Sequence, residues 1–259
     1  MATDASARGR LTRLLRFYSS RGGEEERIAE GQFVSLAQYV GHMRAEQRAI
    51  YYLIGDELKS AARSPHLDYF RREKIEVLFL VDPLDGFMLA GLTEYEGFPL
   101  KNVDDAGLDL PAARSGREKA AEAEADAAPP AEFEALIAHA KERLGERVTD
   151  VRASDRLVDS PARLVSPEDA KGRDMDRVRR LIEKDYTIPK KIMELNRRHP
   201  LVKNLAALLA AGQSEALALV GECIEQLYEN SLLLEGLHPN PAEMVGRIQA
   251  LMEAATKAS

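Results

Sequence analysis

The chain has 259 residues, 45% of them apolar, which is enough for one large globular domain or two modest ones. Its 36 Lys and Arg residues against 43 Asp and Glu give a formal charge of −7, which disfavours sequence-independent binding to DNA or RNA. The single cysteine, Cys223, excludes an internal disulfide and a cysteine-cluster metal site. Residues 1–10 are polar and expected to be disordered rather than a secretory signal, so we expect a soluble, cytoplasmic protein.

Two apolar segments in the first half of the chain predict a parallel sheet. Ile50–Ile54 and Ile75–Val81 are near-continuous apolar runs, and a helical stretch, Asp56–Arg72, separates them. Two such strands joined by a helical crossover are typical of a βαβ unit that is covered on both faces. With a further helix that Ser35 can cap, they predict a small α/β domain of three layers, α/β/α, over residues 11–103.

The next part of the chain marks a domain boundary. Residues 104–130 lose their aromatic side chains and are rich in Ala, Glu, Asp and Lys, which predicts a charged linker or a solvated helix. Beyond it we expect a helix that Gly145 ends and short strands near Val148–Arg152 and Ala162–Val165. These elements predict an α+β domain over residues 131–259 that becomes wholly helical toward its end.

Two amphipathic helices are predicted to close the chain as a hairpin. Ser214 can cap the first and Gly236 can end it, and the second starts at a capping-box sequence, Asn240–Glu243. Apolar residues recur along both at three- and four-residue spacing. They are Leu217, Val220, Ile224, Leu227, Leu234, Met244, Ile248, Leu251 and Ala255. This spacing does not decide between packing on the hairpin's own domain and packing on a second copy, although self-association is somewhat favoured.

Residue patterns typical of enzymes are scarce. The sequence contains no phosphate-binding glycine loop and no nucleophile elbow, and its five histidines are too scattered for a metal-ligand signature. We therefore predict no catalytic, cofactor-binding or metal-ligating residues. Asp82 and Asp85 follow the second strand, at the edge where α/β sheets often bind ligands, so a small-molecule enzyme is an alternative. Capping of the next helix by Asp82-Pro83 is the favoured interpretation.

Eight phrases, in order across nearly the whole chain, resemble the heat shock protein 90 family of chaperones in its bacterial form, HtpG. The phrases are Leu14–Phe17, Tyr39–Tyr52, Ser64–Leu67, Ile75–Pro83, Leu92–Gly97, Asp159–Ala162, Glu194–Asn196 and His199–Lys203. The resemblance implies that residues 11–103 are the end of the family's middle domain and residues 131–259 its C-terminal dimerisation domain. The family's ATP-binding domain and its hydrolysis-assisting arginine precede this part, so we expect no ATP or Mg²⁺ cofactor and no ATPase here.

The same resemblance implies two kinds of interaction surface. The terminal hairpin is expected to form a homodimer as a four-helix bundle. Its interface residues would be Leu217, Val220, Ile224, Leu227, Ile248, Leu251 and Met252. Non-native client proteins would contact the helix after Asp82-Pro83 and an amphipathic helix within Ser166–Thr187. The client-binding residues would be Phe87, Met88, Met175, Val178, Leu181 and Ile182.

The expected function is therefore that of a chaperone fragment that dimerises and shields non-native proteins. One alternative is a regulatory, dominant-negative partner that pairs with full-length chaperone and lowers its ATP turnover. Neither nucleic acid nor membrane is an expected partner. The chain ends in Thr256–Ser259 instead of the Met-Glu-Glu-Val-Asp tail of eukaryotic members, so tail-binding helical-repeat co-chaperones are not expected either.

Overall fold

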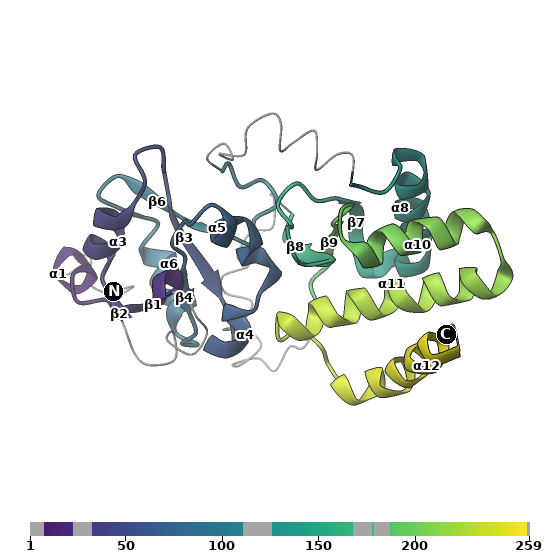
Figure 1. Ribbon diagram of the computed structural model, residues 1–259. Helices are drawn as coiled ribbons and strands as arrows, with labels where there is room; N and C mark the ends of the chain where they lie inside the picture. The colour runs from purple at the N-terminus through teal and green to yellow at the C-terminus, as the bar shows by residue number, and fades with distance from the viewer. Residues whose placement is uncertain (1–7, 23–32, 111–125, 168–177, 179–186, 258–259) are drawn as a thin grey trace. The chain divides into compact units, whose positions relative to one another are not determined.

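The computed structural model describes residues 8–22, 33–110, 126–167, 178 and 187–257 (Figure 1). The chain divides into two compact units, one formed by Met1–Ala112 with Ser166–Thr187 and the other by Ala113–Val165 with Ile188–Ser259. Both units combine strands with helices, and the chain ends in helices, which confirms the predicted mixed α/β class with a helical end. In the described ranges, none of the helices has the length and apolar character that a membrane crossing requires.

The first unit is built on a six-stranded sheet. Its elements are α1 (Arg8–Thr12), β1 (Phe17–Ser19), the 3-10 helix η1 (Ser20–Gly22), β2 (Phe33–Val34), α3 (Leu36–His42), β3 (Ile50–Ile54), α4 (Leu58–Ala62), the 3-10 helix η2 (Pro65–Leu67), α5 (Asp68–Arg72), β4 (Leu78–Leu80), α6 (Asp85–Gly91), β5 (Glu94–Tyr95) and β6 (Phe98–Asn102). The strand order is β2-β1-β4-β3-β6-β5, and β3 pairs in parallel with both β4 and β6. The helices between β3 and β4 form the crossover, so the predicted βαβ unit is confirmed. Helix α1 begins inside the stretch that we expected to be disordered.

Helices contribute to the hydrophobic core on both sides of this sheet. Tyr51 of β3 belongs to a buried cluster that includes Phe70 of α5. Its neighbour Tyr52 belongs to a second cluster, which includes Tyr39 of α3 and Leu89 of α6. Successive side chains of a strand point to opposite faces, so the two clusters lie on opposite faces of β3. The complete three-layer arrangement stays a prediction.

Helix α3 is fixed to the sheet through polar contacts. The Ser35 hydroxyl accepts a hydrogen bond from the Gln38 N–H at 3.2 Å and the Gln38 side chain accepts one from the Ser35 N–H at 2.9 Å, which confirms the predicted cap. The Tyr39 hydroxyl donates to the Glu76 carbonyl at 2.7 Å and accepts from the Tyr51 N–H at 3.0 Å. Burial raises the pKa of Tyr39 above its ordinary value, so its hydroxyl stays protonated.

The second unit combines a three-stranded sheet with long helices. Its elements are α8 (Pro130–Leu144), the 3-10 helix η3 (Gly145–Arg147), β7 (Val148–Ala153), β8 (Ala162–Val165), β9 (Lys191–Leu195), α10 (Pro200–Ala211), α11 (Ser214–Leu234), the 3-10 helix η5 (Pro241–Glu243) and α12 (Met244–Lys257). The predicted strands at β7 and β8 are confirmed. Strand β9, which we did not predict, is the central strand, parallel to β7 and antiparallel to β8.

The helix ends of the second unit follow the sequence signals in part. Gly145 ends α8 with a φ of 53°, and Gly236 follows α11 with a φ of 67°, as predicted. Ser214 is the first residue of α11 and not its cap, because Gln213 occupies that position without a side-chain hydrogen bond. The prediction of a capping box at Asn240–Glu243 is also wrong. The chain forms a 3-10 turn there, in which the Asn240 side chain bonds the Glu243 side chain at 3.0 Å.

Candidate interaction surfaces

Helix α11 directs one apolar face into the core of its own unit. Val220, Ile224 and Leu227 are 0%, 1% and 5% exposed. They belong to a buried cluster with Leu136 of α8 and Leu205 of α10. We expected these three residues at a dimer contact, and the structure corrects that assignment by placing them inside the protomer. Helical spacing identifies an apolar face but does not say which neighbour covers it.

Helix α12 contrasts with α11, because Met244 is its only buried residue. Of its predicted contact residues, Ile248 is 40% and Met252 64% exposed, and Leu251 is partly buried. Large apolar side chains on both helices of the hairpin are exposed. We call them the exposed hairpin residues: Leu217, Leu233, Leu234, Val245, Ile248 and Met252.

Two carboxylates of α11 pair with arginines at the end of α8 and in the 3-10 helix η3 that follows it. Arg147 donates to both oxygens of Glu225 at 2.7 Å, and the Nε of Arg143 lies 3.0 Å from Glu225 Oε1. Arg143 also donates to Glu222 at 3.1 Å. Burial raises the pKa of Glu225, but the hydrogen bonds from Arg147 and the charges of both arginines outweigh it and hold the pKa below its ordinary value. Glu225 is therefore ionised at neutral pH.

Arg247 joins α12 to the same row of carboxylates. Its Nε donates to Glu222 Oε2 at 3.2 Å, and its Nη1 donates to Glu229 Oε2. The Arg247 side chain is 21% exposed and that of Glu229 is 17% exposed. This guanidinium therefore bridges two carboxylates of α11 from a partly buried position.

A second buried ion pair explains why β9 escaped prediction. Glu194 lies in the central strand, 3% exposed, and accepts hydrogen bonds from Arg163 at 2.8 Å, Arg152 at 2.8 Å and the Ser154 hydroxyl at 3.0 Å. Burial raises the pKa of Glu194, but the charges and hydrogen bonds of Arg163 and Arg152 hold it below its ordinary value. A charged residue in mid-strand hides the apolar run on which strand prediction depends.

The helix after Asp82-Pro83, α6, places apolar side chains at the surface. Phe87 is 38% and the neighbouring Leu84 67% exposed, whereas Met88 packs partly against the core. Asp82 Oδ1 accepts the Leu84 N–H at 2.8 Å, and Asp85 Oδ2 accepts the Asp82 N–H at 3.0 Å. Both carboxylates thus stabilise the turn that leads into α6. The predicted cap at Asp82 is wrong, because Leu84 occupies the N-cap position of α6 and receives no side-chain cap hydrogen bond.

The other predicted client-binding residues in the amphipathic segment are buried or lie outside the described residues. Met175, Leu181 and Ile182 lie outside the described residues. Val178 is described and is 4% exposed, so its side chain is buried instead of facing solvent as a client-contacting surface requires. Of the predicted client-binding residues, only Phe87 is among the exposed large hydrophobic side chains that the described ranges contain.

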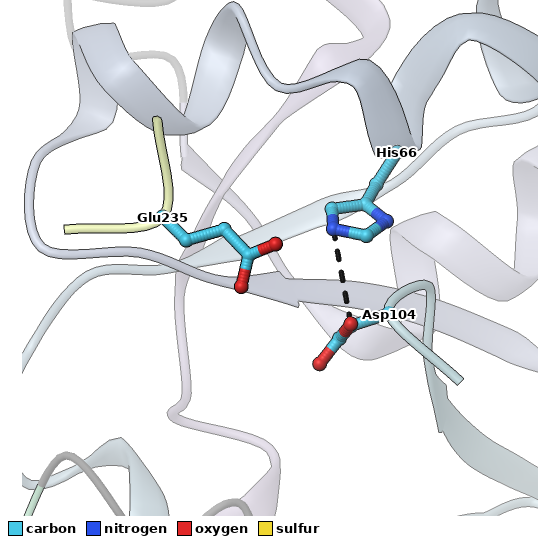
Figure 2. A group of neighbouring side chains, drawn as sticks. All are labelled: His66, Asp104 and Glu235. Carbon is cyan, nitrogen blue, oxygen red and sulfur yellow. Dashed lines mark ion pairs between the residues drawn. The ribbon is translucent and has the colours of Figure 1, made fainter. Parts of the chain in front are cut away.

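One polar cluster of the first unit was not predicted (Figure 2). His66, 2% exposed, has its Nε2 3.8 Å from Asp104 Oδ1. Asp104 also accepts hydrogen bonds from the Ser166 N–H at 3.1 Å and hydroxyl at 2.5 Å, so it attaches Ser166 to this unit. Glu235, drawn in the same figure, belongs to the second unit, where it pairs with Lys191 at 2.7 Å. His66 and Asp104 are 38 positions apart in the chain, so no local sequence pattern indicates this pair.

Comparison with known proteins identifies the class of protein. The family model described as Hsp90 protein matches residues 1–259, and the chain therefore belongs to the heat shock protein 90 family. It is 39% identical over 258 residues to the chaperone protein HtpG of Chlorobaculum tepidum, 37% over 256 residues to that of Chlorobium phaeovibrioides and 36% over 250 residues to that of Oleidesulfovibrio alaskensis. These alignments cover 98%, 98% and 96% of this chain but 38% of each relative. The predicted resemblance to the bacterial type is confirmed.

Proposed function

We propose that this chain is a chaperone module that forms a homodimer through α11 and α12 and binds non-native proteins. The observation that carries the proposal is the set of exposed hairpin residues, because a soluble protein rarely leaves so many large apolar side chains uncovered at one end of the chain. The likeness to HtpG chaperones supports it.

A second copy of the chain is the partner that fits the exposed hairpin residues. In a twofold-symmetric dimer each exposed residue contributes twice, once from each protomer. Burying an isoleucine, leucine or methionine side chain fully contributes about 1.5–3 kcal/mol, against an association cost of about 4–15 kcal/mol. Six such residues per protomer are therefore enough to support a stable dimer even when each is only partly covered.

The dimer is tested by sedimentation equilibrium on the full chain and on Met252→Asp. We expect a wild-type dimer and a dissociation constant at least about 100-fold weaker in the variant, because the interface would have to bury an unpaired carboxylate. Met252 is 64% exposed, so the fold of the protomer should be unaffected. Gln249→Asp, at an exposed polar position of the same helix, is the matched control. A wild type that stays monomeric at every concentration would reject the proposal.

For client binding we propose the surface at Leu84 and Phe87. These side chains flank the start of α6 and are exposed, so they can cover apolar segments of an unfolded chain without rearrangement of the domain. The test is suppression of light scattering by heat-denatured citrate synthase. The double variant Leu84→Ser, Phe87→Ser should lose most of the suppression. Leu14→Ser, at a position 70% exposed in the same unit, should keep it. Equal loss in both variants would contradict the proposal, because client binding would then not depend on this particular surface.

A further inference from the structure

Helix α12 is attached to its protomer with little apolar contact. Met244, at its first residue, is the one buried residue of the helix, and Val245, Ile248 and Met252 are each at least 40% exposed. The polar contacts described above, from Arg247 to Glu222 and Glu229, lie one turn further along the helix. The placement of α12 against α11 thus depends on Met244, on the partly buried Leu251 and on a single guanidinium group.

We propose that Arg247 is a positioning residue for the dimer surface. Its ion pairs hold α12 against α11 and so direct the exposed hairpin residues of α12, Val245, Ile248 and Met252, toward a second copy of the chain. This inference rests on the proposed dimer, which it deepens by naming the residue that orients the interface. It also makes dimer formation sensitive to charge, although the contact between protomers is apolar.

The geometry favours arginine for this role. Glu222 and Glu229 are seven residues apart, which is about two turns or about 10.5 Å along a helix. A guanidinium group presents several donors in a fixed plane and can bond two acceptors at once, whereas a lysine ammonium acts as a point charge. The partial burial of Arg247 and Glu229 limits the screening that weakens exposed ion pairs.

The ion pairs of Arg247 belong to a larger network of charged side chains. Glu222 is held from the other side by Arg143, which also contacts the buried Glu225. One of the two carboxylates that receive Arg247, Glu222, is therefore also held by Arg143 of α8. Hydrogen-bonded networks of this kind are more rigid than isolated pairs.

The first arm of the test measures amide hydrogen exchange of α12 in the full chain, in the Met252→Asp background so that only monomer is present. Arg247→Glu should raise the exchange rates of α12 about tenfold, because the reversed charge repels the carboxylates of α11. The charge swap, Arg247→Glu with Glu229→Arg, should bring them back to within about threefold of the parent. Lys257→Glu, which makes the same charge change at the exposed end of the helix, should leave them unchanged.

The second arm measures the dimer dissociation constant by sedimentation equilibrium without the Met252 substitution. Arg247→Glu should weaken the dimer about tenfold or more, Arg247→Met should do so to a smaller extent, and the charge swap should restore most of the affinity. Unchanged exchange in Arg247→Glu, or a charge swap that restores neither quantity, would overturn the inference. A monomeric wild type would reject the proposed dimer, and the exchange measurements would still decide whether Arg247 positions α12.

Discussion

Helices α11 and α12 have similar apolar spacing but opposite relations to the core. Nine residues of α11 are buried, among them Val220, Ile224 and Leu227, while α12 buries Met244 alone. The difference follows from their neighbours, since α11 packs against α8, α10 and β8 and α12 packs against α11. In the protomer, the same sequence pattern serves as core in one helix and as free surface in the next.

The largest expected effect is that of a charge inserted into α11. Ile224→Asp places a carboxylate at a position that is 1% exposed, inside the main cluster of the second unit. We expect a loss of more than about 4 kcal/mol in the free energy of unfolding of this unit, measured by urea titration. If the variant instead unfolds at the same urea concentration as the wild type and is merely monomeric, Ile224 belongs to the interface and not to the core.

A matched pair of truncations compares the two helices directly. Ile224→Ala should cost about 2–5 kcal/mol, because it leaves a cavity in a packed core. Ile248→Ala, at a position 40% exposed, should change the unfolding free energy of the monomer by less than about 0.5 kcal/mol and act on dimer affinity instead. Similar costs for the two substitutions would show that α12 is packed as firmly as α11.

Acid should weaken the second unit. The pKa values of Glu194 and Glu225 are held below their ordinary value in the fold, so their contribution is complete above the unfolded pKa of about 4.3. It is lost as the pH falls below that value and through the lower folded-state pKa. We expect a loss of about 1–3 kcal/mol in urea titrations between pH 5 and about pH 2.5. Glu194→Gln should flatten this dependence, and an unchanged slope would exclude Glu194 as its source.

The smallest expected effect concerns the backbone of α12. Gly246 lies inside this helix, and a methyl group added there meets nothing within 4 Å. Gly246→Ala should therefore stabilise the helix by about 0.5–1 kcal/mol by reducing the freedom of the unfolded chain. Slower amide exchange in α12 is the measurement. Faster exchange would mean that the glycine is needed for a close contact.

Local signals with a physical mechanism predicted local structure well. The strand Ile50–Ile54 has the bounds that its apolar run indicates, and the polar residues Ser35 and Gln38 form the expected cap. Gly145 ends α8, because glycine adopts positive φ without strain. The predicted second strand is shorter than expected, since pairing is confined to Leu78–Leu80.

Features that depend on distant partners could not be predicted. Strand β9 was missed because Glu194 interrupts its apolar run, and the buried carboxylate is compensated by Arg163 and Arg152, which lie 31 and 42 residues earlier in the chain. The sequence likewise did not indicate what covers the apolar face of α11, because that face packs against α8 and α10, which come from other parts of the chain. The role of Arg247 has no local signature, because its partners lie 18 and 25 residues earlier in the chain.

The position of β9 has a consequence for biosynthesis. Among the residues that the structure describes, β7 and β8 do not pair with each other, and each has β9 as its ladder partner. Until β9 has left the ribosome during synthesis, β7 and β8 lack this ladder partner, and unpaired strand edges are prone to associate with other chains. The second sheet can therefore be completed only after most of the chain has been synthesised.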